Sequence, residues 1–395
     1  MKFPKILILY GVITLIYIAI TLLQVQAINF QKKQADDQRK LLAEVIYQPD
    51  FIATSSTPIT REAVSGKPAA STISPKIILG QNFVTGVYGY DFDDSMKNYL
   101  EVIKPSGIVI YDRNIKNDNQ LKKLISDLQS WAKEATGQPL FIMIDEEPGG
   151  ASRLGLFKNM FGVITPGWEQ MENDIKKMAD IGINVDLAPI MDYPFNGESF
   201  IKKRILKNDL EDFEKFNDKF VDTLKKNCVY ATLKHFPGLG VFADNPHSNH
   251  LNDDIDNDTF DKSVSLFKNG FDSGADFIMT NTAVYKNIDP DNPVIISKAI
   301  VTDLLRNKLN YKGMVITDDI SNMPFAGNQN LPQAISKALM AGHNLILFSH
   351  ENVKLVQIYK NLLSRMEENP ELKTVIENNY RDITSFKREK LMCHQ

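Results

Sequence analysis

Short runs of apolar and β-branched residues alternate along most of this chain with longer stretches of helical period. Stretches such as those from Asn119 and from Leu210 carry apolar residues at three- and four-residue steps, which predicts amphipathic helices. The candidate strands are FVTGVYG from Phe83, GIVIYD from Gly107, LFIMIDE from Leu140, INVDLAP from Ile183, VYATLKHF from Val229, DFIMTNT from Asp276, GMVITDD from Gly313 and NLILFSH from Asn344.

Strands that are apolar throughout and are joined by helical crossovers are typical of a parallel sheet covered on both faces. Eight strand–helix units in a row predict an α/β fold of the (β/α)8 TIM-barrel type over residues 79–395. A doubly wound open sheet is the alternative.

The N-terminal residues differ from everything that follows. Lys2 and Lys5 precede an uncharged apolar run, residues 6–30, that is long enough to cross a bilayer as one helix. We interpret residues 1–30 as a signal peptide or a membrane anchor, and favour an uncleaved transmembrane helix because signal-peptide cores are usually shorter. Residues 31–78 are polar and rich in Ser, Thr, Pro and Ala, which predicts a flexible linker. We therefore expect an extracytoplasmic protein that is membrane-anchored or secreted.

Charge and cysteine content narrow the possible partners. A formal net charge of -4 gives no basic footprint for nucleic acid. The two cysteines, Cys228 and Cys393, lie far apart and suggest neither a disulfide framework nor a metal site. The segment KHFPGLG from Lys234 lacks the Lys-Ser/Thr ending of a phosphate-binding loop, so nucleotide binding is disfavoured.

Polar side chains follow most of the predicted strands at the point where each ends, which is where barrel enzymes assemble their sites. They are Asp112, Arg113, Asn114, Asp145, Glu146, Asp192, Lys234, His235, Asn281, Asp318, Asp319 and His350. Asp and Asn also cap the helices that follow strands, and we favour a capping or core role for Asp319, Asn281 and His350 taken singly. Capping does not readily explain Asp145 and Asp318 together with the Lys234-His235 pair.

A Gly/Pro-rich loop follows the strand that ends in Lys234 and His235. A strand that delivers a basic pair, followed by a loop able to bring a histidine inward, is a common construction in barrel enzymes. The loop carries Asp244, Asn245, His247 and His250. A metal site is disfavoured because a flexible loop is a poor place for two ligands at this spacing, and no glutamate base follows in helical phase.

Five segments, taken in order, carry a resemblance to a known family: IDEEPGGASRL from Ile144, GINVDLAPIMD from Gly182, KHFPGLG from Lys234, DPDNP from Asp289 and GMVITDD from Gly313. They resemble motifs of glycoside hydrolase family 3, in its single-domain β-N-acetylhexosaminidase branch. The resemblance covers residues 80–370. It implies a retaining exo-glycosidase that needs no metal or organic cofactor and releases terminal N-acetylglucosamine from cell-wall fragments or related β-glycosides.

The resemblance also implies the catalytic residues. It places the nucleophile at Asp318, and a carboxylate at the mouth of a buried strand is well fixed for forming a glycosyl-enzyme ester. It implies an Asp-x-His acid/base arrangement on the loop, in which the histidine falls on His247 and the aspartate on Asn245. A neutral Asn245 can orient the ring but favours its protonation less than a carboxylate would, and Asp244 is the alternative support. His250 is a weaker candidate for the same task.

The sugar-binding residues implied by the resemblance are Asp145, Arg153, Lys234, His235 and, less directly, Arg113. Arg153 keeps its spacing of eight residues from Asp145. Pro148 displaces the two glycines of the motif by one place, and Gly150 stands where the family has its first arginine. The shape of the loop over residues 145–153 is therefore expected to differ from that of the family.

Other activities on the same fold stay open. Asn245 and the altered loop leave room for a surface carbohydrate-binding protein that has lost turnover. A β-glucosidase of the same family is a third reading. Phosphate could also replace water as the acceptor, because a neutral imidazole repels an anion less than a carboxylate does.

Overall fold

The structure is a computed structural model that describes residues 26, 33, 36–42, 44, 73–159, 162–163, 167–207, 209–245, 252–253, 255–322, 330–350 and 352–391. The chain divides into two units, residues 1–58 and 59–395, and the described residues of the first are helical. No helix among the described residues is long and apolar enough to span a bilayer. Apart from Gln26, the apolar segment 6–30 lies outside them.

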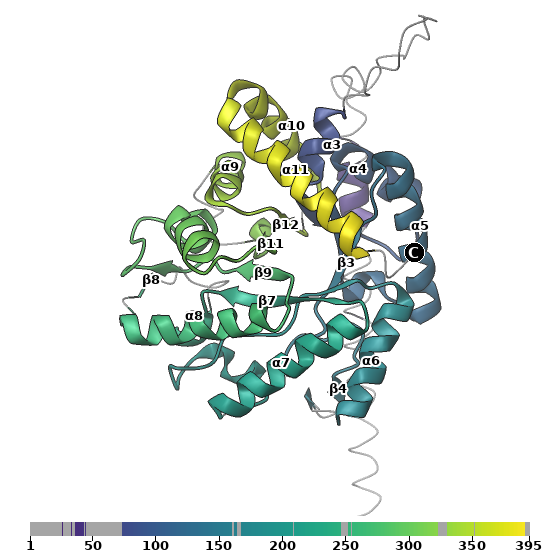
Figure 1. Ribbon diagram of the computed structural model, residues 1–395. Helices are drawn as coiled ribbons and strands as arrows, with labels where there is room; N and C mark the ends of the chain where they lie inside the picture. The colour runs from purple at the N-terminus through teal and green to yellow at the C-terminus, as the bar shows by residue number, and fades with distance from the viewer. Residues whose placement is uncertain are drawn as a thin grey trace, which may run out of the picture. The chain divides into compact units, whose positions relative to one another are not determined.

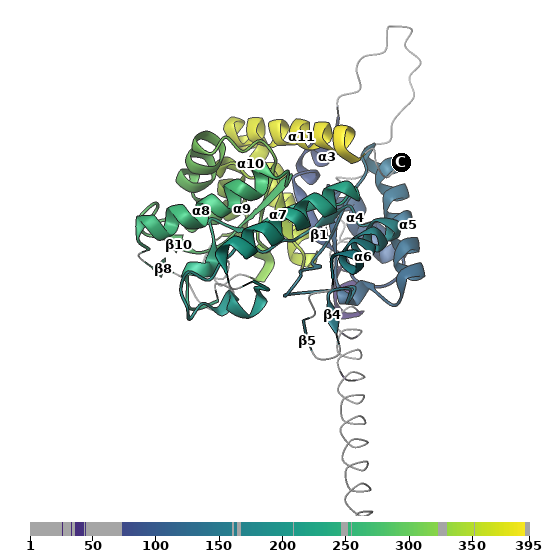
Figure 2. The same ribbon diagram turned by 60° about the horizontal axis from the view of Figure 1, so that its bottom comes forward.

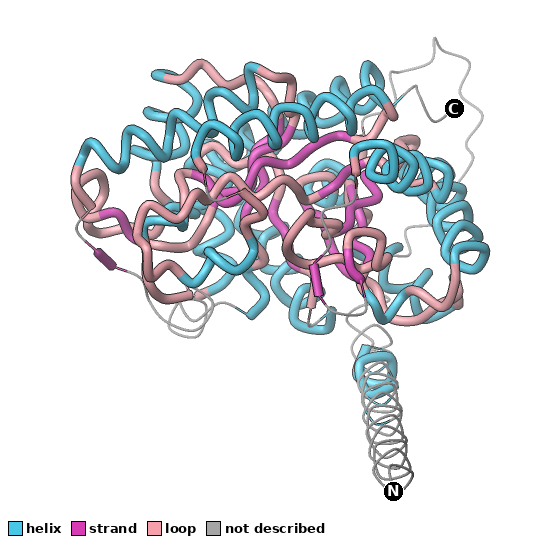
Figure 3. The backbone as a smooth tube through the Cα atoms, turned by 90° about the horizontal axis from the view of Figure 1, so that it is seen from below, coloured by secondary structure: helices cyan, strands magenta, loops and turns pink. Residues whose placement is uncertain are grey.

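Eight parallel strands form one sheet, whose order is β11-β9-β7-β6-β3-β2-β1-β12. They are β1 (Phe83–Gly86), β2 (Gly107–Ile110), β3 (Phe141–Ile144), β6 (Val185–Asp186), β7 (Tyr230–Phe236), β9 (Phe277–Thr280), β11 (Met314–Thr317) and β12 (Ile346–Phe348). The ends of this order meet through a parallel bridge between Ile316 of β11 and Leu345 beside β12. The sheet is therefore a near-closed barrel, with its strands gathered inside the helices (Figure 3). Each of the eight apolar runs contains one strand, and the open-sheet alternative is wrong.

Helices alternate with the strands and surround the barrel (Figures 1 and 2). They are α3 (Pro75–Gly80), α4 (Asp94–Ile103), α5 (Asp118–Thr136), α6 (Trp168–Ile181), α7 (Leu210–Lys226), α8 (Asn257–Asp272), the π-helix η5 (Ala299–Lys308), α9 (Leu331–Ala341), α10 (Asn352–Glu368) and α11 (Pro370–Lys390). Capping side chains define where several begin: Asp93, Asn117 and Asp209 each accept a backbone N–H from the first turn. Gly137 and Gly182, both at positive φ, end α5 and α6.

Short elements lie in the loops between these units. They are the 3-10 turns η1 (Asp112–Asn114), η2 (Phe200–Arg204), η3 (Leu239–Val241), η4 (Val294–Ile296) and η6 (Ile320–Asn322), and the strand pairs β4 (Lys158–Asn159) with β5 (Gly162–Val163) and β8 (Asn252–Asp253) with β10 (Val284–Tyr285). Three of the turns begin within three residues of the end of a barrel strand: η1 follows β2, η3 follows β7 and η6 follows β11.

The apolar side chains inside the barrel form one core cluster with the last helix. It contains Val84, Val109, Phe141, Met143, Val185, Leu187, Tyr230, Phe277, Met279, Met314, Ile316, Leu345, Leu347, Ile383, Phe386 and Leu391. Because both faces of each strand are covered, the barrel is a packed core and the polar chemistry is left to the strand ends.

Helix α11 closes the N-terminal end of the barrel, lying across the sheet in Figure 1. The ring of Phe386 lies 5.3 Å from that of Phe277 and 5.8 Å from that of Phe141, both edge to face. The buried ammonium of Lys387 donates to the side chain of Gln81 at 2.9 Å, and burial holds its pKa well below the usual value. This end of the barrel is therefore sealed.

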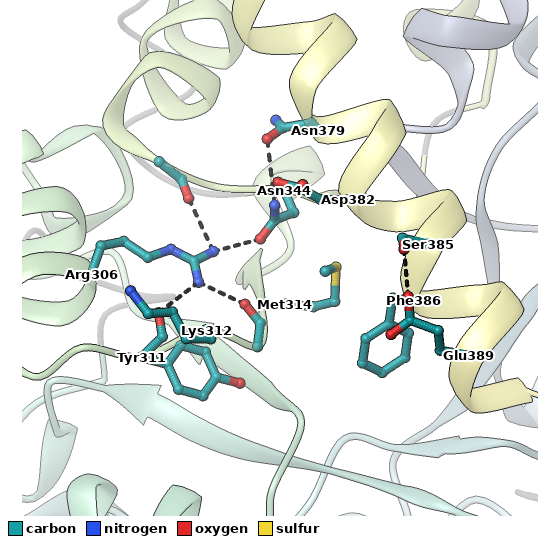
Figure 4. Close-up of a pocket in the computed structure, with 12 residues that line it drawn as sticks. Arg306, Tyr311, Lys312, Met314, Asn344, Asn379, Asp382, Ser385, Phe386 and Glu389 are labelled. Atoms are coloured by element: carbon teal, nitrogen blue, oxygen red, sulfur yellow. Dashed lines mark hydrogen bonds between the residues drawn. The ribbon is translucent and has the colours of Figure 1, made fainter.

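A cavity of about 510 Å³ lies beside α11 at the same end, but the fold uses its polar groups (Figure 4). The guanidinium of Arg306 donates to the backbone carbonyls of Tyr311 at 3.2 Å and Gly313 at 2.6 Å, and to the side chain of Asn344 at 2.5 Å. These bonds tie the start of β11 to the start of β12. Arg306 is thus a structural brace rather than a free anion-binding group.

Cys228, between α7 and β7, is disulfide-bonded. The sequence suggested no disulfide framework, and it gave no sign of this single bond. The other cysteine of the chain, Cys393, lies outside the described residues. Distance along a chain says little about pairing because a barrel returns distant segments to one end.

Candidate active site

A pocket of about 270 Å³ opens among the carboxyl ends of the barrel strands. It is lined by Tyr111, Asp145, Glu147, Ala151, Arg153, Leu187, Arg204, Lys234, His235, Met279, Asp318, Asp319, Leu347 and His350. Five of the residues expected from the sequence, Asp145, Arg153, Lys234, His235 and Asp318, therefore share one pocket. Their strands run parallel, so their carboxyl ends meet at one face of the barrel.

Lys234 stands at the centre of a buried ion-pair network. Its ammonium lies 2.8 Å from Asp145 Oδ1 and 2.6 Å from Glu147 Oε1, and Glu147 also receives the guanidinium of Arg204 at 2.7 Å. Burial opposes the charge on Glu147, but Lys234 and Arg204 outweigh it and lower its pKa to about 2. Burial likewise opposes the charge on Lys234, and Asp145 and Glu147 outweigh it, so its pKa is raised. Glu147, Lys234 and Arg204, whose pKa is also raised by Glu147, are therefore charged at neutral pH.

Arg153 extends this network to the rim of the pocket. Its guanidinium lies 3.5 Å from Asp145 Oδ2 and 3.6 Å from the exposed carboxylate of Asp112. Burial opposes its charge, yet both carboxylates favour it, and its pKa is raised. Asp145 is thus held between two cations, with its oxygens directed by Lys234 and Arg153. A carboxylate fixed in this way suits accepting hydrogen bonds from sugar hydroxyls.

Asp192 fixes the imidazole of His235. Its Oδ2 lies 2.7 Å from Nδ1 of the ring, and its Oδ1 accepts the backbone N–H of His235 at 3.0 Å and that of Leu239 at 2.7 Å. A carboxylate on Nδ1 favours the tautomer that carries its proton there. This leaves Nε2 of His235 for a ligand in the pocket.

Asp318 lies directly after β11 and is almost fully buried, at 6% exposure. Its backbone N–H donates to Thr280 O of the neighbouring β9 at 3.0 Å, and its Oδ1 accepts the backbone N–H of Asp319 at 2.7 Å. The backbone of Asp318 and one of its carboxylate oxygens are therefore held in place at the end of β11.

Asp319 is held by a second set of bonds at the same strand end. Its Oδ1 accepts the backbone N–H of Ser321 at 2.9 Å, and its Oδ2 accepts from the hydroxyl of Ser349 and lies 3.0 Å from His350 Nδ1. Burial opposes its charge, but the bonds from His350, Ser321 and Ser349 outweigh it and lower its pKa. Its hydrogen bonds run to η6 and to the end of β12. Asp319 is therefore an ionised part of the pocket wall, not only the helix cap expected from the sequence.

Arg113 supports the pocket wall rather than lining the pocket. Its guanidinium donates to Val87 O at 2.9 Å and to Ser349 O at 2.8 Å, and it lies 4.4 Å from the ring centres of both Tyr88 and Tyr111. These contacts hold the ring of Tyr111, which does line the pocket. The structure thus gives Arg113 a bracing task between β1, β2 and β12.

The loop after β7 is described only as far as residue 245. Asp244 is exposed and Asn245 is half-buried, while His247 and His250 lie outside the described residues. Where His247 lies relative to Asp318 therefore stays a prediction. Within the described part of the chain, no group of His, Cys, Asp and Glu side chains is arranged to hold a metal ion.

Three pocket features were not foreseen from the sequence. Glu147 follows Asp145 by two residues and could have been suspected as part of the same acidic strand end. Arg204 lies in η2, in the run IKKR, and nothing in that run marks one cation out from the others. The pairing of Asp319 with His350 joins residues 31 positions apart, and spacing alone does not reveal it.

The chain matches a known family over most of its length. The sequence model of the Glycosyl hydrolase family 3 N terminal domain matches residues 79–385. The chain belongs to glycosyl hydrolase family 3. A protein named Beta-hexosaminidase from Psychromonas ingrahamii is 30% identical over 300 residues, which are 71% of this chain and 86% of that protein. A protein of the same name from Xanthomonas campestris is 25% identical over 284 residues, or 67% of this chain and 83% of that one.

Solved structures agree with this family membership. The β-N-acetylhexosaminidase of Beutenbergia cavernae is 26% identical and superposes with a TM-score of 0.71, covering 80% of this chain and 99% of that one. A family 3 β-N-acetylglucosaminidase from Paenibacillus has the same fold, with a TM-score of 0.71 at 24% identity, covering 80% of this chain and 63% of that one. As a family 3 member the chain is a glycoside hydrolase, and the pocket at its strand ends is its candidate active site.

Proposed function

We propose that this family 3 glycosidase is a retaining exo-enzyme that hydrolyses terminal β-N-acetylglucosaminides, including those of cell-wall fragments. One observation carries the proposal: a fixed carboxylate, Asp318, lines the same small pocket as the charged network of Asp145, Lys234 and Arg204. The names of the hexosaminidase relatives support the choice of sugar. A pocket of this size accommodates a terminal sugar rather than an extended polysaccharide, which favours exo-action.

The charged network would bind the non-reducing sugar. Asp145 and Glu147 accept hydrogen bonds from hydroxyls, and Lys234 and Arg153 donate to hydroxyl oxygens. His235, with Nδ1 held by Asp192, offers Nε2 to a further hydroxyl. Sites built to hydrogen-bond hydroxyls reject analogues that lack them, because buried polar groups are then left unpaired.

The proposed reaction has two steps. Asp318 attacks the anomeric carbon while His247, the acid/base that the family resemblance implies, gives a proton to the leaving oxygen. The glycosidic bond breaks as the ester to Asp318 forms. His247 then removes a proton from water, whose oxygen attacks the same carbon and releases Asp318. No step requires a cofactor or a metal.

A comparison of chromogenic N-acetyl-β-glucosaminide with the matching β-glucoside tests the function. We expect turnover of the first to exceed that of the second, and Asp318→Asn to lower kcat at least about 1000-fold. A fluorinated N-acetylglucosaminyl substrate that slows hydrolysis of the ester should label Asp318, detectable by peptide mass. Preferred glucoside turnover would replace the sugar assignment. Binding without release, unchanged by Asp318→Asn, would favour a carbohydrate-binding protein.

We further propose that the protein is extracytoplasmic and tethered through its N-terminal segment. The uncharged apolar run of residues 6–30 supports a membrane helix or signal, and residues 31–78 have a linker composition. The disulfide at Cys228 is also typical of an oxidising compartment. Extraction of native membranes with alkaline carbonate tests the tether, because an integral protein stays in the pellet and a secreted one does not.

A further inference from the structure

We propose that His350 is a positioning residue of this active site, acting on the nucleophile Asp318 through Asp319. The proposal rests on the proposed function, since it gives His350 a part in that same reaction. The sequence alone favoured a core or capping role for His350.

The imidazole of His350 is bound to Asp319 and not to the helix that it precedes. Its Nδ1 lies 3.0 Å from Asp319 Oδ2 and 2.9 Å from the hydroxyl of Ser349. Among the described residues, no hydrogen bond joins the ring to α10. The ring lines the pocket, and its side chain is 31% exposed. A capping side chain would instead turn toward the first N–H groups of α10.

Asp319 connects this imidazole to the nucleophile. The backbone N–H of Asp319 donates to Asp318 Oδ1, so any shift of residue 319 moves the nucleophile. The two carboxylates are also adjacent in sequence, and like charges on neighbouring side chains repel each other. The contact between His350 Nδ1 and Asp319 Oδ2 stabilises the charge on Asp319. His350 thus controls both the orientation and the electrostatics of the nucleophile.

The other charged and titratable groups around Asp319 and His350 do not replace the contact of His350 with the Asp319 carboxylate. The guanidinium of Arg113 contributes a favourable charge to Asp319 but donates its own bonds to backbone carbonyls. Tyr111, whose ring lies 5.3 Å from that of His350, is neutral because burial raises its pKa. Arg153 forms its ion pairs with Asp145 and Asp112. Within the described residues, His350 is thus the basic side chain in direct contact with Asp319.

The test is the pH dependence of kcat/KM for the full-length protein with chromogenic N-acetyl-β-glucosaminide. His350→Ala removes both the hydrogen bond and the charge, and His350→Gln keeps a donor but not the charge. We expect the acid limb of the profile to move to higher pH by about one unit in both variants. At the optimum, His350→Ala should lower kcat about tenfold with KM changed less than about twofold, and His350→Gln should recover most of that loss.

A second background separates this effect from a general loss of structure. Asp319→Asn removes the carboxylate charge with which His350 interacts. The double variant, Asp319→Asn with His350→Ala, should therefore have its acid limb at the same pH as the Asp319→Asn single variant. Lys177→Ala, which breaks an exposed ion pair with Asp118 that includes no pocket-lining residue, serves as a control that should keep the wild-type profile.

Three results would overturn the proposal: a wild-type acid limb in both His350 variants, an effect on KM alone, or an equal shift in the Asp319→Asn background. Effects on KM alone would make His350 a substrate contact. Absence of turnover in the wild-type protein would instead refute the proposed function. The two failures are therefore distinguishable.

Discussion

Two buried carboxyl groups close to the pocket, Glu147 and Asp186, are held in opposite protonation states. Glu147 has two cationic partners, which outweigh burial and lower its pKa to about 2. Asp186 accepts only the backbone N–H of Glu146 at 3.0 Å, and its Oδ2 has no hydrogen-bond partner among the described residues. Burial therefore raises the pKa of Asp186 well above its usual value. The same residue class serves as an anion in one place and as a neutral acid in the other.

Glu147→Gln should destabilise the protein by about 3 kcal/mol at pH 7, because Lys234 and Arg204 lose a buried counter-charge. Since the folded pKa of Glu147 is depressed from 4.5 to about 2, its contribution is present above pH 4.5 and is lost as the pH falls toward 2. Urea unfolding of both proteins across this range measures the difference. Glu211→Gln, at an exposed ion pair, is the matched control. A difference that stayed constant down to pH 2 would contradict the assignment.

The Asp186→Asn variant should have a higher free energy of unfolding than the wild type at pH 7. We expect the increase to exceed about 0.5 kcal/mol, which is the usual limit for substitutions at exposed sites. The pKa of Asp186 is higher in the folded protein than in the unfolded chain, so the wild type loses stability as the pH rises above the pKa of the unfolded chain. Asparagine does not ionise and therefore avoids this loss, and its side-chain oxygen can still accept the backbone N–H of Glu146. The two proteins should converge near pH 3. Urea unfolding at both pH values tests this, with Asp118→Asn at an exposed site for comparison. Equal stability at pH 7 would mean that Asp186 is ionised.

At the scale of elements, strand and helix boundaries follow from local patterns but the closing helix does not. The strand runs are apolar because both faces are covered, and this property is legible in the sequence. Helix α11 has an ordinary amphipathic pattern that does not indicate which surface it covers. Only the fold reveals that Phe386 and Lys387 seal the N-terminal end of the barrel.

Phe386→Ala should lower the free energy of unfolding by roughly 3 kcal/mol, because it leaves a cavity between the rings of Phe141 and Phe277. KM should stay at the wild-type value, since the pocket lies at the other end of the strands. Chemical denaturation with parallel kinetics provides both measurements. The exposed neighbour Arg388→Ala should change stability by less than about 0.5 kcal/mol. A large change in KM would mean that the two ends of the barrel are coupled.

At the scale of the whole molecule, the candidate active site described above belongs to the barrel unit. Every pocket-lining residue lies between residues 111 and 350, and the family match begins at residue 79. The proposed task of the N-terminal apolar segment and linker is to hold the enzyme at a membrane, a task separate from the chemistry.

A chain that begins at Ile73, just before α3, should therefore keep the wild-type kcat/KM on a small chromogenic substrate within about twofold. The same truncation should move the protein from the membrane fraction to the supernatant. Fractionation followed by an activity assay checks both expectations in one preparation. A large loss of kcat/KM in a truncated protein of normal thermal stability would show that the N-terminal residues take part in catalysis.

The sequence by itself determined the barrel class and the strand ends where polar chemistry collects, because both depend on periods and motifs within short segments. It also singled out Asp145, Arg153, Lys234, His235 and Asp318, which the structure brings into one pocket. It did not identify Arg204 or the pairing of Asp319 with His350, since these contacts join separate loops and carry no fixed spacing.

Only the tertiary structure decided which charges are buried together and so which are compensated. The protonation of Glu147 and Asp186 depends on partners up to 87 residues away, or on their absence among the described neighbours. Local sequence specifies how each segment folds. The electrostatic energy of a buried group is a sum over everything that the closed barrel places around it, and that sum exists only once the barrel has formed.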